Sequence, residues 1–280
     1  MKWIVIFVFL GGVTVGQNSI LWRITGKGIK DTSYIYGTIH LSNKKFFYVN
    51  PLVHEIKKKV EAGVFEIKLQ EDSLLYIAKA MMANSGNRVM DLYSQEEQEV
   101  IYDYFKRHGI TSMMVNTMKP IALTTMLLTF IYPPDTAGAI DQLLQNDFKK
   151  MDKPVFALET IRMQSDLLMS MPIDLQKKEL WESLANLDSL TNSLRQLDSV
   201  YTLQDLKGIS TFLDDLEEEE YLNKELLNDS RNLKMVEKLP GIMNKQSVLV
   251  CVGAVHLCGE DGIIELLRKK GYHLEPLLEE

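Results

Sequence analysis

The chain has 280 residues, of which 46% are apolar and 25% charged, proportions that are ordinary for a soluble globular protein. Its 31 Lys and Arg residues and 38 Asp and Glu residues give a net charge of −7, which argues against nucleic acid as a main partner because phosphate binding needs a basic surface. A chain of this length can bury a large hydrophobic core, as one domain or two.

The first 16 residues have the layout of a secretory signal peptide. A basic start is followed by the apolar run Ile4–Leu10, and small residues come before Gln17. We therefore expect residues 1–16 to be removed and the protein to be exported, to the periplasm or the extracellular space. An uncleaved amino-terminal anchor is the alternative. The run is shorter than the roughly 20 apolar residues that span a membrane, so we expect no membrane span in the mature chain.

The mature chain begins with the order strand, strand, helix, strand. Residues 20–24 alternate in polarity, a glycine-containing turn follows, and residues 33–36 are predicted to pair with the first strand as a hairpin. Asn50-Pro51 predicts the start of a helix that runs to residue 60, because the missing N–H of proline costs nothing there. Residues 63–67 predict the next strand, and the strand–helix–strand order implies a parallel pair with a crossover.

Helical patterns dominate residues 71–150 and 161–239, on either side of a short strand predicted at 154–160. Ser94 and Glu97 form a capping box, and Gly109 marks the other end of that helix. The apolar stretch 121–132 is too short to span a membrane and predicts a buried helix. No segment rich in proline, glycine or serine separates these parts. We therefore expect one domain over residues 17–280, in which the helical insertions cover the sheet as a cap.

The most apolar predicted strand lies near the carboxyl end of the chain. Residues 248–252 are all apolar and run into Gly253, a pattern typical of a strand buried on both faces. A helix at 263–271 and a last strand at 272–275 follow. The predicted fold class is therefore α/β, with a mixed central sheet built from both ends of the chain and a helical cap inserted between the halves.

The two cysteines, Cys251 and Cys258, both lie in this last part of the chain. An exported protein could join them in a disulfide. Their side chains would then have to meet across the segment that positions His256, and so we expect two buried, reduced thiols. Metal ligation by Cys258 is a third possibility.

The sequence Gly-x-x-His follows two of the predicted strands. It occurs as Gly37 to His40 and again as Gly253 to His256. Open α/β sheets place their ligands at the carboxyl ends of the strands, so the repeat predicts that the two histidines lie together. The plain alternative is that each is an ordinary hydrogen-bonded loop residue, since Gly-x-x-His alone is a weak motif.

Glutamates occupy two of the other predicted strands, at Glu66 and Glu159. Burying an unpaired carboxylate is costly, so each must point outward or have a partner. Imidazoles and carboxylates together suit a divalent metal such as manganese, cobalt or zinc. With two histidines and one carboxylate as ligands, an open position remains for a water that the metal activates. The second carboxylate would act as a general base or orient a histidine.

Several blocks of the chain resemble, in the same order, the TraB/GumN family, which includes the TIKI metalloproteases. The blocks are Trp22-Arg23-Ile24, Tyr36-Gly37-Thr38-Ile39-His40, Phe65-Glu66, Gly138-Ala139-Ile140-Asp141, Leu158-Glu159-Thr160, Arg231-Asn232 and Val252-Gly253-Ala254-Val255-His256-Leu257. The resemblance covers nearly the whole mature chain. It implies an α/β fold related to the erythromycin-esterase and haem-binding ChaN-like proteins.

The resemblance also implies metal-dependent proteolysis. The implied metal ligands are His40, Glu66 and His256, with Glu66 as a ligand or general base. The supporting catalytic candidates are Glu159, Arg231 and Asn232, and Arg231 would polarise the substrate carbonyl or stabilise the oxyanion. Animal TIKI proteins end in a membrane anchor, whereas this sequence ends in 275–280 without one, so we expect a soluble exported protein.

The leading hypothesis is a secreted, metal-dependent peptidase that acts on a peptide or protein. The alternative is a non-catalytic protein that sequesters a peptide or a haem-like ligand in the same pocket. An esterase-like activity on a small ester is suggested only by kinship of fold.

Overall fold

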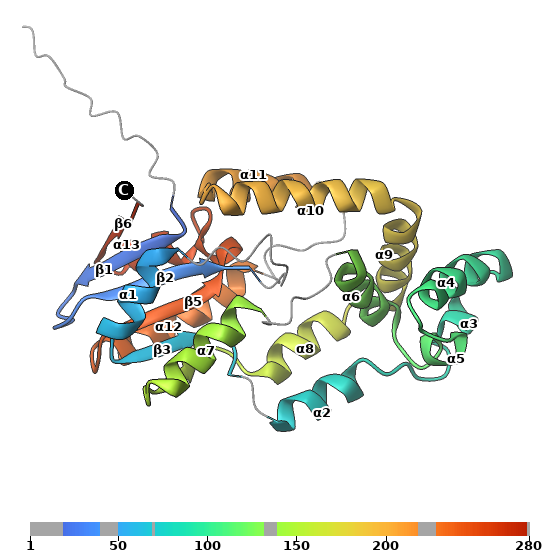
Figure 1. Ribbon diagram of the computed structural model, residues 1–280, viewed down its shortest axis with the longest axis horizontal. Helices are drawn as coiled ribbons and strands as arrows, with labels where there is room; N and C mark the ends of the chain where they lie inside the picture. The colour runs from blue at the N-terminus through green and yellow to red at the C-terminus, as the bar shows by residue number, and fades with distance from the viewer. Residues whose placement is uncertain (1–18, 40–49, 69–70, 132–138, 218–227, 279–280) are drawn as a thin grey trace, which may run out of the picture.

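The computed structural model describes residues 19–39, 50–68, 71–131, 139–217 and 228–278 (Figure 1). The predicted signal segment 1–16, His40 and Gly138 lie outside the described residues. Within them, six strands form one sheet in the order β4-β3-β5-β2-β1-β6. The strands are β1 Leu21–Gly26, β2 Ser33–Thr38, β3 Ala62–Phe65, β4 Val155–Ala157, β5 Val248–Gly253 and β6 Tyr272–Pro276.

The sheet is mixed, and both ends of the chain contribute to it, as predicted. Strands β2, β5, β3 and β4 run parallel, while β1 is antiparallel to both of its neighbours, β2 and β6. The predicted hairpin is confirmed in the pairing of Trp22 with Ile35. The crossover prediction is correct in direction, but β2 and β3 are not neighbours, because β5 lies between them.

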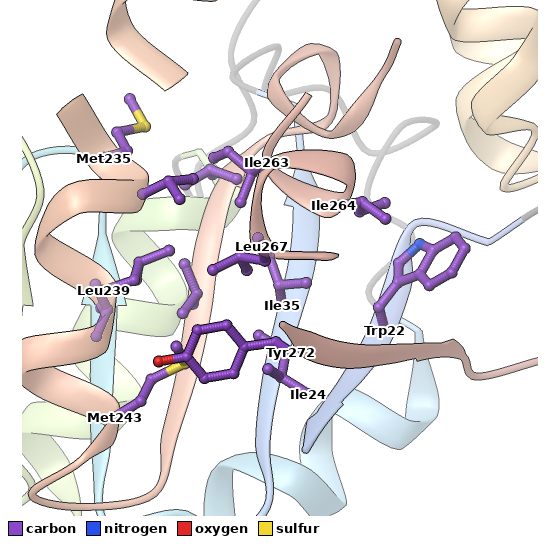
Figure 2. Close-up of a cluster of buried hydrophobic side chains, with 14 of the residues drawn as sticks. Trp22, Ile24, Ile35, Met235, Leu239, Met243, Ile263, Ile264, Leu267 and Tyr272 are labelled. Atoms are coloured by element: carbon purple, nitrogen blue, oxygen red, sulfur yellow. The ribbon is translucent and has the colours of Figure 1, made fainter. Parts of the chain in front are cut away.

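Helices cover both faces of the sheet, which gives three layers. On one face lie α12 (Ser230–Met243) and α13 (Ile263–Lys269), whose apolar side chains pack on alternate residues of β5 (Figure 2). On the other lie α1 (Pro51–Lys59), α7 (Ile140–Lys150) and parts of α10 (Leu187–Thr202) and α11 (Leu206–Glu217). Successive side chains of β5 point to opposite faces of the sheet, as in any strand, and so they contact the two helical layers in turn.

A separate group of helices projects from the carboxyl edge of the sheet. Its members are α2 Glu71–Ala80, α3 Val89–Leu92, α4 Gln95–Arg107, α5 Ser112–Val115, α6 Pro120–Ile131, α8 Ile161–Met169 and α9 Ile173–Ala185. Together they are called the helical block below. Figure 1 shows α4, α6 and α9 beside the sheet and not over its faces. The predicted helical insertions between the two halves of the sheet are present. Of their helices, α7 and α10–α12 lie on the faces of the sheet, and the helical block lies at its edge.

The helical block has a hydrophobic core of its own, which includes Ile101, Phe105 and Leu180. The capping box predicted at its α4 is present, since the Ser94 hydroxyl accepts from the Glu97 N–H and the Glu97 carboxylate from the Ser94 N–H. The predicted buried helix at 121–132 is α6, in which residues 120–124 are all buried and only Thr125 and Thr129 are exposed.

Two further expectations concern the cysteines and the membrane. Cys251 and Cys258 are both buried and form no disulfide, as predicted. Burial, followed by the charge of Asp141, raises the pKa of the Cys251 thiol well above its usual value. No helix in the described part of the chain has the length and apolar character needed to cross a bilayer.

Candidate functional site

The parallel strands β2, β5, β3 and β4 all end at one edge of the sheet, and this edge holds the candidate residues. Thr38 at the end of β2 pairs with Gly253 at the end of β5, and Phe65 at the end of β3 pairs with Cys251 of β5 and with Ala157 of β4. The segments that follow these strands therefore begin side by side.

Both glutamates lie just beyond their strands, not within them as predicted. Strand β3 ends at Phe65 and β4 at Ala157, which corrects the expected spans 63–67 and 154–160. The Glu159 N–H still donates to the Glu66 carbonyl oxygen at 2.7 Å. This hydrogen bond extends the pairing of β3 and β4 by one step, and so both carboxylates lie at the same edge of the sheet.

Close packing accounts for the glycines of the two Gly-x-x-His sequences. A Cβ on Gly37 would lie 2.9 Å from the Cα of Ala254, the first residue of the 3-10 turn η2 (Ala254–Leu257) that carries His256. A Cβ on Gly253 would lie 3.2 Å from Glu66 Oε1, the atom that accepts the Gly253 N–H at 2.5 Å. Both glycines thus allow an approach that a side chain would obstruct.

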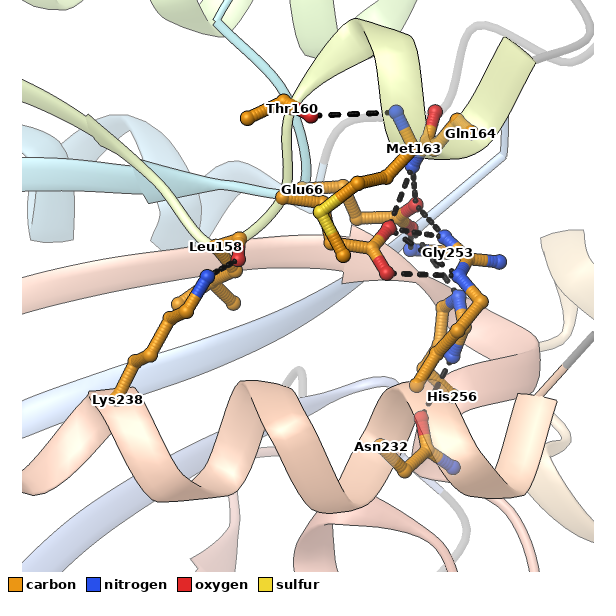
Figure 3. A network of polar contacts seen from close by, with 11 residues as sticks. Glu66, Leu158, Thr160, Met163, Gln164, Asn232, Lys238, Gly253 and His256 are labelled. Atoms are coloured by element: carbon orange, nitrogen blue, oxygen red, sulfur yellow. Dashed lines mark hydrogen bonds and ion pairs between the residues drawn. The ribbon is translucent and has the colours of Figure 1, made fainter. Parts of the chain in front are cut away.

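Glu66 and Glu159 share one arginine (Figure 3 draws the network). Arg231 donates through Nη2 to Glu66 Oε2 at 2.9 Å and to Glu159 Oε2 at 2.6 Å, and through Nε to Glu159 Oε1 at 2.9 Å. Both glutamates are about 95% buried, with exposed fractions of 4% and 5%. Burial lowers the pKa of Arg231, but the bonds and charges of Glu159 and then Glu66 outweigh it and raise that pKa above its usual value.

Gln164 of α8 is a fourth member of this network, which the sequence did not predict. Its Nε2 donates to Glu66 Oε2 at 2.8 Å and to Glu159 Oε2 at 3.0 Å. A glutamine on an amphipathic helix gives no signal in the sequence, so only the fold reveals it. Through Gln164, the helical block contacts the carboxylates at the sheet edge.

Asn232 fixes the orientation of His256. The amide nitrogen of Asn232 donates to the Asp261 carbonyl oxygen at 2.9 Å, which leaves Oδ1 to accept from His256 Nδ1 at 2.6 Å. The proton therefore sits on Nδ1, and Nε2 faces Glu66 Oε1 at 3.5 Å. Both residues are buried, at 0% and 2% exposed. Asn232 is thus a positioning residue for the imidazole.

A second polar network lies beneath the first Gly-x-x-His sequence. The Thr38 hydroxyl donates to Asp141 Oδ1 at 2.7 Å, and the Tyr201 hydroxyl donates to the Gly37 carbonyl oxygen at 3.1 Å. Tyr201 is fully buried, and burial followed by the neighbouring Tyr36 raises its pKa well above the usual value. These bonds tie the end of β2 to α7 and α10.

Five of the six predicted site residues meet at this edge: Glu66, Glu159, Arg231, Asn232 and His256. The sixth, His40, lies outside the described residues, which end at Ile39 on this segment. In the described part of the chain, no group of three His, Cys, Asp or Glu residues could hold a metal ion. The prediction that His40 joins His256 therefore stays a prediction.

A pocket of about 280 Å³ opens beside these groups. Its polar side is formed by Glu66, Gln164, Arg231, Gly253 and His256, and its apolar side by Leu167, Leu168 and Val255. A buried imidazole and a carboxylate at the wall of a pocket are suitable groups for acid–base chemistry or for metal binding.

Comparison with known proteins gives one result. None of the curated proteins and none of the solved structures that were compared matches the chain significantly. The sequence pattern of the TraB/PrgY/gumN family matches residues 20–276, which takes in the whole sheet and the helical block. The chain therefore belongs to the TraB/PrgY/gumN family.

Proposed function

We propose that this protein is an exported, metal-dependent peptidase that uses the residues at the carboxyl edge of its sheet. The observation that carries the proposal is the pair formed by His256 Nε2 and Glu66 Oε1, 3.5 Å apart in a buried site. Two ligand atoms on a tetrahedral ion, each bound at about 2.1 Å, would be separated by about 3.4 Å. The distance between these two atoms therefore matches that expected between two ligand atoms of one metal ion.

The kinds of donor atom at the site also suit a divalent cation. Carboxylate oxygens of Glu66 and Glu159 lie together at Arg231, and His256 Nε2 faces Glu66 Oε1. We propose His40 as the third ligand, with Glu66 and His256, and manganese, cobalt or zinc as the metal. When bound, such a metal would polarise a carbonyl and lower the pKa of a water.

We assign the remaining residues to orienting the site's side chains and stabilising charge during the reaction. Both oxygens of Glu159 accept bonds from Arg231, so we assign Glu159 the task of holding the guanidinium in place. Arg231 lines the pocket beside His256, where its charge can stabilise the oxyanion of a hydrolysed amide. Asn232 keeps the proton on His256 Nδ1 and thereby leaves Nε2 to bind. Glu66 serves as a ligand or as the general base.

Export and a peptide or protein substrate complete the proposal. The layout of residues 1–16 supports export, and the net charge of −7 disfavours nucleic acid as a substrate. We propose the periplasm or the extracellular space as the place of action.

Cleavage assays test the proposed function directly. The protein from residue 17 onward is incubated with a mixture of peptides and manganese, cobalt or zinc, and products are identified by mass spectrometry. We expect cleavage that a chelator abolishes and that is lost in both His40→Ala and His256→Ala. Cleavage that persists with chelator, or in both variants, would contradict the mechanism. Binding of peptide or haem without turnover would support the non-catalytic alternative.

A further inference from the structure

The apolar side of the pocket comes mostly from one helix. Helix α8 has no fully buried residue, although its sequence is amphipathic. Its Leu167 and Leu168 are half-buried and line the pocket, and Val255 of η2 lies on the same wall. Apolar side chains that face a pocket gain free energy when an apolar group displaces water from them.

This apolar wall stands directly next to the polar groups of the proposed reaction. Gln164 lies one helical turn before Leu167 and Leu168 on α8, and it donates to the carboxylates of Glu66 and Glu159. The same helix therefore carries both the wall and a contact to the site. A group that fills the wall side would share the pocket with His256 and Glu66, which line it as well.

The size of the pocket limits what can occupy it. Pockets for drug-sized ligands have volumes of about 300–1,000 Å³. The 280 Å³ here lies just below that range, so it suits one side chain with its flanking backbone better than a large planar ligand. The apolar wall favours an apolar side chain, because a charged group held against Leu167, Leu168 and Val255 would lose its hydration there.

We propose that the pocket binds an apolar side chain of the peptide substrate, immediately next to the hydrolysed bond, and that Leu167 and Leu168 set this preference. The inference rests on the proposed function, since it names the substrate class of the same site. Leucine is the best-fitting example, and alanine would leave part of the wall in contact with water.

A peptide series tests the preference. Peptides that differ at one position, with Leu, Ala, Glu or Lys in an otherwise Gly/Ser sequence, are compared by kcat/KM with the activating metal. We expect kcat/KM for the leucine peptide to exceed that for the alanine peptide by about tenfold or more, because alanine lacks several carbons that would fill an apolar pocket. Leu168→Ala should lower kcat/KM for the leucine peptide about tenfold, and by a larger factor than for the alanine peptide. Leu167→Asp should shift the preference toward the lysine peptide.

The matched control is Leu75→Ala, which removes the same atoms from a leucine that is 62% exposed on α2. It should leave the order of the four peptides unchanged. Equal cleavage of the leucine and glutamate peptides, or an equal loss for every peptide in Leu168→Ala, would overturn the inference even if cleavage itself is confirmed.

A binding measurement separates this inference from the proposed function. Fluorescein-labelled leucine and alanine peptides are titrated with the protein in the presence of a chelator, and anisotropy is followed. If no peptide is cleaved with any metal, the proposed function fails, yet tighter binding of the leucine peptide that Leu168→Ala removes would still support the pocket assignment. Equal binding of the two peptides would overturn it.

Discussion

The sheet and the helical block are built in different ways, and the candidate site lies where they meet. The sheet joins both ends of the chain, and all six residues of β5 are buried between helices. The helical block is made from two parts of the chain, 71–131 and 161–185, which α7 and β4 separate. It has a core of its own, and it exposes apolar side chains such as Met82 and Met113. The sheet edge and α12 therefore fix the charged groups, whereas the block supplies one helix, α8, as a wall beside them.

The largest effect should come from removing the arginine that joins the two glutamates. Arg231→Ala leaves Glu66 and Glu159 buried without their shared cation, and breaking a buried ion pair in this way costs about 3–5 kcal/mol. We expect this loss in the free energy of unfolding measured by urea denaturation at neutral pH. The matched control is Arg162→Ala on α8, where the arginine is exposed and pairs with Asp166 at 3.7 Å. A loss for Arg231→Ala no larger than that of the control would contradict the described network.

The next prediction asks whether the two regions unfold together. Leu267→Ala removes a fully buried side chain beneath the sheet, and Leu180→Ala does the same in the core of the helical block. Each should cost about 2–5 kcal/mol. Gln164 links α8 to the site, and α10 packs on the face of the sheet. We therefore expect a single unfolding transition, which each variant shifts to lower denaturant concentration and which circular dichroism and fluorescence report with the same midpoint. Two transitions, each shifted by one variant, would show independent units.

A smaller effect is expected from the residue that orients the imidazole. Asn232→Ala removes the acceptor for His256 Nδ1, and loss of such a partner typically costs about 10–100-fold in metal affinity or activity. Calorimetric titration with zinc or manganese measures the affinity. The control is Asn244→Ala, an exposed asparagine at the end of the same helix. An unchanged affinity in Asn232→Ala would remove Asn232 from the site.

The smallest effect should appear at the surface of the helical block. Arg88 hydrogen-bonds Asp91 and lowers the pKa of that carboxyl to about 2. The ionised Asp91 carboxylate therefore contributes to stability above its usual pKa near 4, and this contribution is lost as the pH falls through about 2. Asp91→Asn should lower the Tm slightly at pH 7, with the difference disappearing toward pH 2. Arg88→Ala, which removes the same hydrogen bonds from the other side, should show the same trend.

Much of the sheet could be predicted from the sequence because its signals are local. The apolar run before Gly253 predicted β5, and Asn50-Pro51 predicted α1, where Asn50 indeed accepts the Leu52 N–H. The meeting of Glu66, Glu159, Arg231, Asn232 and His256 also agrees with the resemblance to the family. Their mutual contacts follow from strand order, which places β5 between β2 and β3.

The remainder depended on contacts between distant residues. The ends of β3 and β4 were misplaced by two or three residues, because the apolar residues Ile67 and Leu158 lie beyond the last ladder pair, Phe65 and Ala157, and extend the strand pattern in the sequence. Periodicity predicted helices at 71–150 and 161–239 but not which of them share a core, so the sequence did not indicate which helices pack on the sheet and which form the helical block. Gln164 was missed because its role appears only when α8 lies against the sheet edge.

The central claim is that His40 and His256 bind the same divalent metal with Glu66. Calorimetric titration of manganese, cobalt and zinc into the wild type, His40→Ala, His256→Ala and His273→Ala tests it most directly, since His273 is an exposed histidine on β6 outside the site. The account predicts that both site variants bind the preferred metal at least about tenfold more weakly while His273→Ala binds as the wild type does. Wild-type affinity in His40→Ala or in His256→Ala would contradict it.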